Sequence, residues 1–236
     1  MTEGRRAALV RLSVQIGVSF GDLSLLDEAL THPSYTNEAK DDIPHNERLE
    51  FLGDAVLDMV VGEYLFRRYP DMPEGNLTKA RASVVSEEPL ACVCASFHMG
   101  NFLLLGKGEA LTGGRTRNSI MADAFEAVVG AVYIDCSYTA ARDFILKQLD
   151  KYLQLVDKGI YGKDYKTYFQ ELLQRDGAQD IRYRLCREEG PDHNKTFFME
   201  VTVNGEIMGT GSGKTKKSAE QHAAYKALEK MNALSF

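Results

Sequence analysis

Two patterns of apolar spacing divide this chain. Up to about residue 155, apolar residues recur every three or four positions, as they do on the buried side of an amphipathic helix. Prolines and a Gly-Gly pair interrupt the pattern and mark helix ends. The expected helices cover approximately residues 8–18, 22–30, 46–68, 76–97, 118–135 and 138–155. The first part of the chain is therefore predicted to be all-helical.

The spacing changes in the last third of the chain. A helix is expected at about 165–175, and the runs IRYRLCRE, TFFMEVTVNG and EIMGTGSG then alternate as β-strands do. Asn204-Gly205 lies between the last two runs and is a strong signal for a tight hairpin. A final helix is expected from about Ser218 to Met231. The order α-β-β-β-α predicts a small α+β domain.

A polar stretch with Gly159 and Gly162 separates the two patterns and predicts a linker. We assign residues 1–158 to an all-helical domain, 159–163 to the linker and 164–233 to the α+β domain. A length of 236 residues with 44% hydrophobic residues is sufficient to bury sizeable cores.

Charge is distributed unevenly between these parts. Residues 1–155 hold 15 basic and 22 acidic side chains, whereas residues 156–236 hold 13 and 12, which gives the overall net charge of −6. This balance argues against a uniformly basic nucleic-acid binder. Charges interrupt the first residues too often for a signal peptide, and no apolar run reaches the ~18 residues of a membrane span. We expect a cytoplasmic protein with no membrane partner.

The four cysteines lack the paired spacing of a zinc site. They stand in apolar segments, which favours buried thiols without a chemical role. These residues are Cys92, Cys94, Cys136 and Cys186.

The stretch NERLEFLGDAVLDMVVGEYLF places three carboxylates on one side of a helix. At about 100° per residue, Glu50 and Asp54 lie within about 60° of Glu47. An ordinary solvated face would explain three acids. However, the same side carries Phe51 with Val61 and Leu65, which indicates that it meets other protein.

A second helix, NSIMADAFEAVVGAVYID, is apolar nearly all round except for Asp123 and Glu126, one turn apart. No Lys or Arg occurs from residue 118 to 141, so a counter-charge must come from elsewhere, and Arg48 or Arg81 could supply it. Bound metal is the alternative, and carboxylates without His or thiolate suit Mg²⁺ or Mn²⁺ rather than zinc. Two such ions could activate water and stabilise the leaving oxygen of a phosphodiester.

These stretches resemble the ribonuclease III family. NERLEFLGDAVLD is similar to the family signature, and LTHPSYTNE, PEGNLTKARASVVS and NSIMADAFEAVVGAVYID occur around it as they do in the family. The tail, with DYKTYFQELLQ, GPDHNKTFFMEV and GTGSGKTKKSAEQHAA, resembles a double-stranded-RNA-binding domain. The resemblance covers nearly the whole chain.

The resemblance implies a homodimeric endonuclease that cuts double-stranded RNA by two-metal-ion hydrolysis with Mg²⁺, for which Mn²⁺ can substitute. It implies 5′-phosphate and 3′-hydroxyl ends with short 3′ overhangs, processing of ribosomal RNA precursors and other transcripts, and no small-molecule cofactor. The implied metal ligands, of which Asp54 and Glu126 are also catalytic, are Glu50, Asp54, Asp123 and Glu126. Glu47 and Glu74 are implied as supporting acids, and Phe51 as a dimer contact.

For the second domain, the resemblance implies contacts with RNA grooves and phosphates. Lysines just before the last helix suit phosphate, because helix N-termini favour anions. A plain solvated run is the alternative interpretation. The implied RNA-binding residues are Gln170, Glu171, His193, Lys214, Lys216 and Lys217.

Three other interpretations remain. His32 in THPSY could be a general base, but its place before Pro33 favours a capping or packing role. A non-catalytic RNA-binding protein would have lost a metal acid, and all four are present. A metal phosphohydrolase acting on small molecules would explain the acids but not the basic tail.

Overall fold

The computed structural model describes residues 1–39, 43–157, 165–175, 177, 179–190, 195–213, 215–231 and 233. The chain forms two compact units, Met1–Leu153 and Gln154–Phe236. We call them the helical unit and the mixed unit, and describe each by itself. The predicted linker at 159–163 lies outside the described residues. Among the described residues, no helix is long and apolar enough to cross a membrane.

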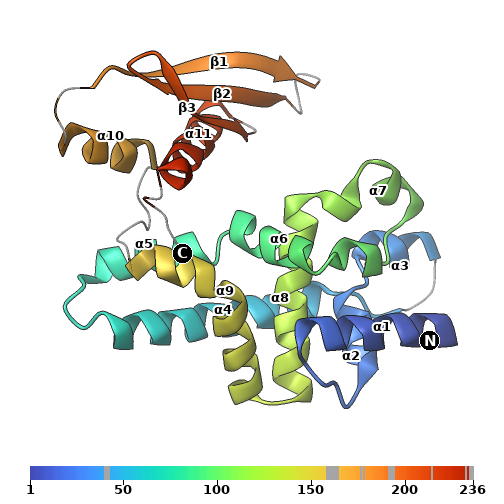
Figure 1. Cartoon of the computed structure of the whole chain (residues 1–236). Coiled ribbons are helices and arrows are strands. Elements are labelled where there is room, and N and C mark those ends of the chain that lie inside the picture. Colours follow the sequence, from blue (N-terminus) through green and yellow to red (C-terminus); the bar gives the residue numbers. More distant parts are fainter. Residues whose placement is uncertain are drawn as a thin grey trace. The chain divides into compact units, whose positions relative to one another are not determined.

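The described part of the helical unit consists of helices, as predicted (Figure 1). Its elements, with the C-terminal helix running on to residue 157, are α1 (Glu3–Ile16), α2 (Leu23–Ala29), α3 (Pro33–Ala39), α4 (Glu47–Arg68), α5 (Glu74–Val84), α6 (Glu87–Ser96), η1 (Met99–Phe102), α7 (Lys107–Leu111), η2 (Gly114–Thr116), α8 (Asn118–Asp135) and α9 (Tyr138–Asp157).

The prediction of one helix at 76–97 was wrong, because two helices, α5 and α6, occupy this stretch. Ser86 separates them in an extended conformation, with φ −75° and ψ 162°, as the N-cap residue of α6. Glu87 and Glu88 then stand in the first turn, where acids favour a helix start. The short elements α3, η1, α7 and η2 were not predicted either.

Helix α8 forms the centre of the helical unit. It contacts α2, α4 and α6, and its apolar residues are buried almost throughout. Phe125 is fully buried and stacks on Phe144 of α9, with ring centroids 5.7 Å apart. Asp123 and Glu126 therefore extend from a helix that the core surrounds.

Two glycines let α4 and α8 approach each other closely. A Cβ on Gly53 of α4 would collide with the carbonyl oxygen of Glu126, and one on Gly130 of α8 would collide with that of Leu49. The backbones pack directly against each other at this point. This contact brings the acidic residues of the two helices together.

We expect Gly53→Ala to destabilise the helical unit by a few kcal/mol, since overpacking a well-packed contact costs roughly 1–3 kcal/mol and here the obstacle is backbone. Gly4→Ala is the matched control, because a Cβ on Gly4 of α1 meets nothing within 4 Å. Thermal unfolding of both variants measures the effect. An unchanged Tm for Gly53→Ala would contradict the close approach.

The mixed unit has the predicted α-β-β-β-α order. Its elements are α10 (Tyr165–Arg175), β1 (Ile181–Glu189), β2 (Thr196–Val203), β3 (Glu206–Gly213) and α11 (Lys216–Lys230). The strands form an antiparallel sheet in the order β1-β2-β3. Asn204 and Gly205 connect β2 to β3 with φ of 52° and 87°, which confirms the predicted hairpin.

Small residues hold α11 against β3. A Cβ on Gly209 would collide with the backbone of Ala223, and one on Gly211 would too. The buried residues facing them on α11 include Ala219 and Ala227. The glycines of GTGSG and the alanines of the last helix therefore form one close contact.

The prediction of four buried thiols is correct only for Cys94. Cys92, Cys136 and Cys186 are exposed, although they stand in apolar segments. Apolar neighbours in the sequence therefore did not determine whether a cysteine is buried or exposed.

Candidate functional site

Three carboxylates meet where α4 packs on α8. Glu50, Asp123 and Glu126 each place one carboxylate oxygen within 4.8 Å of the others. Glu50 comes from the first turns of α4, and the other two from one turn of α8. All three are partly buried. The sequence predicted that these acids would lie together, and this cluster is the candidate site.

Burial, together with nearby acids, raises the pKa of each carboxyl group in the cluster. Burial raises the pKa of Glu126 to about 8, and the charges of Asp54, Asp123 and Glu50 act in the same direction. Burial also raises the pKa of Glu50, with Asp123 as the next cause. The pKa of Asp123 is raised chiefly by burial as well. Full ionisation of the three acids is therefore unfavourable without a counter-charge.

The pKa of Glu126 predicts how the stability of the metal-free protein depends on pH. The folded chain keeps a proton on Glu126 up to about pH 8, whereas an unfolded chain releases it near the ordinary pKa of 4.5. The free energy of unfolding should therefore fall as pH rises between these values. Unfolding of the parent and of Glu126→Gln at several pH values tests this. A stability difference between the two that does not change with pH would contradict the raised pKa.

The excess charge fits a divalent cation. Within the described part of the chain, no lysine or arginine forms an ion pair with Glu50, Asp123 or Glu126. Arg81, a candidate counter-charge, lies instead 3.6 Å from Asp58. A donor set of carboxylates alone suits a hard ion such as Mg²⁺ or Mn²⁺. These residues therefore fit the metal that the sequence suggested.

Two further predicted acids lie beside the cluster. Asp54 is exposed on the next turn of α4, and its charge acts on both Glu126 and Glu50. Glu47 is also exposed, and its charge acts on Glu50. The charge of Asp54 thus acts on the cluster, although its oxygens stand outside the group of three.

Sequence reasoning missed two acids near the site. The charge of Asp58 acts on Glu126, and that of Glu87 acts on Asp123. Asp58 follows Asp54 by one helical turn, so the periodicity of α4 could have identified it. Glu87 begins α6, and its position near α8 follows only from tertiary packing.

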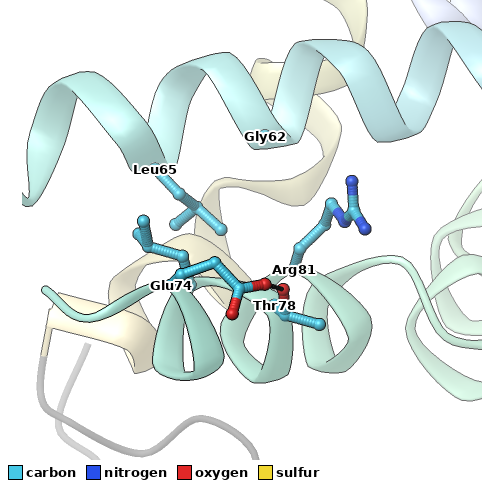
Figure 2. Close-up of a pocket in the computed structure, with 6 residues that line it drawn as sticks. Gly62, Leu65, Glu74, Thr78 and Arg81 are labelled. Carbon is cyan, nitrogen blue, oxygen red and sulfur yellow. Dashed lines mark hydrogen bonds between the residues drawn. The ribbon is translucent and has the colours of Figure 1, made fainter.

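Glu74 lies in a separate pocket between α4 and α5 (Figure 2). The pocket has a volume of about 260 Å³. Thr78 donates a hydrogen bond of 3.0 Å to Glu74 Oε1. Arg81, which also lines this pocket, contacts Asp58 and so connects it to the acids of α4. The structure places Glu74 here rather than in the cluster.

Phe51 is 80% exposed and lies in the chain between half-buried Glu50 and exposed Asp54. Met59 and Phe66, further along α4, are also exposed, at 51% and 71%. We call Phe51, Met59 and Phe66 the apolar stripe of α4. Val61 and Leu65, by contrast, are buried inside the helical unit. Val61 and Leu65 therefore contact other residues of this unit, whereas Phe51 is available for contact with a surface outside it.

The predicted RNA-binding residues are partly described. Gln170 and Glu171 are exposed on α10. Lys216 and Lys217 are exposed in the first turn of α11, where Lys216 lies 3.8 Å from Glu188. His193 and Lys214 lie outside the described residues.

Comparison with known proteins points to one family. Residues 22–153 match a family model described as ribonuclease-III-like, and residues 165–231 match the double-stranded RNA binding motif. The chain is 49% identical to ribonuclease 3 of Enterococcus faecalis over 92% of its own length and 95% of that protein. It is 46% identical to ribonuclease 3 of Natranaerobius thermophilus, over 95% and 96%.

A solved structure resembles the helical part. It is a nuclease domain of ribonuclease III from Campylobacter jejuni, with a TM-score of 0.56 and 40% identity. The match covers 60% of this chain and 96% of that one, which shows structural flexibility in a region involved in dimer formation.

Proposed function

This chain belongs to the ribonuclease III family of double-stranded-RNA endoribonucleases, and we propose that it cuts RNA duplexes by two-metal-ion hydrolysis at the acids between α4 and α8. We propose Mg²⁺ as the metal, with Mn²⁺ as a substitute. The products would carry 5′-phosphate and 3′-hydroxyl ends with short 3′ overhangs. Ribosomal RNA precursors and other structured transcripts are the proposed substrates.

The observation that carries this proposal is the cluster of Glu50, Asp123 and Glu126, whose oxygens lie within 4.8 Å of one another. Burial raises the pKa of all three, and repulsion from neighbouring acids adds to this, so a cation that neutralises them would be bound strongly. When bound, divalent ions supply activation of water and stabilisation of the leaving oxygen.

Each acid at or beside the candidate site has a proposed role. Glu50, Asp123 and Glu126 hold metal, and Asp54 completes the set from the exposed edge of α4. Asp54 and Glu126 are the proposed catalytic residues. Glu47 and Glu74, outside the cluster, are proposed to contact substrate at its margins.

We propose that the mixed unit binds the RNA. Exposed Gln170 and Glu171 of α10, His193, and the lysines before and at the start of α11 would contact grooves and backbone phosphates. Its net charge is nearly balanced, and Glu220 pairs with Lys166 at 2.9 Å, so one unit alone should bind with modest affinity.

We propose that two chains associate through the apolar stripe of α4, with Phe51 as the central contact. The related Campylobacter jejuni domain has a region involved in dimer formation. A dimer would present two RNA-binding units to one duplex, which strengthens binding through effective concentration.

Incubation of the full chain with a long RNA duplex, with and without Mg²⁺, tests the function. We expect short duplex products with 5′-phosphate ends only when Mg²⁺ is present. A parallel incubation with small phosphodiesters tests the alternative function, a metal phosphohydrolase that acts on small molecules. Cleavage of these substrates but not of duplex RNA would contradict the proposal.

Replacing Lys214, Lys216 and Lys217 with Ala should weaken binding to all duplex sequences alike. Each phosphate contact that is lost should reduce the slope of log affinity against log salt by roughly 0.9. Gel-shift titrations at several salt concentrations measure this. Lys226 and Lys230, near the other end of α11, supply the control when both are changed to Ala. An unchanged slope in the triple variant would mean that its lysines only contact solvent.

A further inference from the structure

We propose that Glu188 is a positioning residue of the RNA-binding surface, which holds Lys195 and Lys216 back from backbone phosphates and so limits the affinity for duplex RNA. This proposal rests on the proposed function, because it requires the mixed unit to bind RNA through lysines. It also adds Lys195 to the proposed phosphate contacts. In this role, the carboxylate of Glu188 competes with phosphate for the same ammonium groups.

Glu188 lies between lysines from two different elements. Its Oε2 is 3.2 Å from Nζ of Lys195, which stands just before β2, and its Oε1 is 3.8 Å from Nζ of Lys216, the first residue of α11. The Lys216 ammonium also lies 5.8 Å from the centroid of the Phe197 ring, and Phe197 is the residue opposite Glu188 on β2. The first lysine of α11 is therefore directed towards the end of the sheet.

A β-bulge turns Glu188 towards these lysines. The register of β1 against β2 shifts in the middle of β1, where one extra residue interrupts the pairing. Beyond the shift, Glu188 is opposite Phe197, which is in turn opposite Gly213 of β3. Directly opposite residues face the same side, and a Cβ on Gly213 would collide with the backbone of Ala219 in α11. Glu188 thus faces the side that α11 covers, and without the extra residue it would face the other side.

Neither ion pair fixes its lysine firmly. The side chains of Lys195 and Lys216 are 36% and 61% exposed, and the 3.8 Å contact is too long for a hydrogen bond. Exposed pairs of this kind contribute little to stability and weaken as salt rises. A phosphate can therefore replace Glu188 as the partner of either ammonium. The carboxylate then stays near the bound phosphates, and this proximity of like charges reduces the affinity.

Duplex binding by the full chain tests this role. Gel shifts without Mg²⁺, at several salt concentrations, would compare the parent with Glu188→Gln and Glu189→Gln. Glu189 is the matched control, because it carries the same charge one position along β1 but faces the other side, where it lies 3.1 Å from Arg187. We expect Glu188→Gln to bind about 3- to 10-fold more tightly at low salt, an advantage that shrinks as salt rises. Glu189→Gln should bind as the parent does.

Lys195→Ala tests whether the carboxylate controls this lysine. We expect a larger loss of affinity when the change is made in Glu188→Gln, where the carboxylate no longer competes for the ammonium, than when it is made in the parent. Equal losses in both chains would contradict the competition between Glu188 and phosphate.

Two further results would overturn the proposal. Parent-like or weaker binding by Glu188→Gln would mean that the carboxylate does not limit affinity, and an equal gain in Glu189→Gln would reduce the effect to net charge. The variant with Lys214, Lys216 and Lys217 changed to Ala separates this failure from failure of the proposed function. If that variant binds weakly and Glu188→Gln binds as the parent does, only the role of Glu188 is wrong. If that variant binds as the parent does, the proposed lysine contacts are wrong.

Discussion

Glu126→Gln is expected to bind duplex RNA as the parent does and to cut it more than a hundredfold more slowly. An amide keeps the shape of the side chain but removes the charge that attracts metal. Loss of an outer partner of a metal site already costs about 10- to 100-fold, so loss of a ligand should cost more. Binding should survive because the proposed RNA contacts belong to the mixed unit. Single-turnover cleavage and a gel shift measure the two properties separately.

The raised pKa of Glu126 gives this variant a second property. A neutral amide relieves the repulsion from Asp54, Asp123 and Glu50, so the metal-free variant should be at least as stable as the parent at about pH 8. Lost activity together with gained stability would separate a metal ligand from a core residue. Glu3→Gln, at an exposed site on α1, is the control and should neither slow cleavage nor raise stability. Parent-like cleavage by Glu126→Gln at low Mg²⁺ would remove Glu126 from the site.

Local patterns in the sequence predicted most of the fold. The 3.6-residue period of α4, α8 and α9 and the alternation of the three strands are set by residues within each element. The turn at Asn204-Gly205 was predictable because few other pairs accept two positive φ values in succession. The break between α5 and α6 was missed because apolar residues continue through it, while only Ser86 marks a new helix start.

The acids of the candidate site could also be identified from the sequence, although not their exact arrangement. Asp123 and Glu126 stood out because an apolar helix without basic residues contained them, and Glu50 stood out through its position on α4. The sequence could not show that Gly53 and Gly130 bring these helices into backbone contact, because packing decides that distance. It also could not place Glu74 in its own pocket or Glu87 beside Asp123, since both depend on how α5 and α6 lie against their neighbours.

Phe51→Asp is expected to give a largely monomeric protein that cleaves poorly and still binds RNA. Phe51 is 80% exposed in the single chain, and with Met59 and Phe66 it forms an apolar line on α4 that water would otherwise cover. Burying a Phe contributes roughly 1.5–3 kcal/mol, and a symmetric dimer gains this twice. At about 1.4 kcal/mol per tenfold, the change should weaken association by on the order of a hundredfold or more.

Catalysis should fail together with assembly, because Phe51 lies directly between Glu50 and Asp54 in the chain. A partner that packs on Phe51 would fix the turn of α4 that holds both acids, and a new carboxylate would add charge to an already strained cluster. Leu111→Asp is the matched control, since Leu111 on α7 is 86% exposed but stands outside the apolar stripe. Sedimentation at micromolar concentration, alongside cleavage, decides between the alternatives. If Phe51→Asp remains dimeric while Leu111→Asp dissociates, the interface lies on α7; if both remain dimeric, the apolar stripe of α4 has another role.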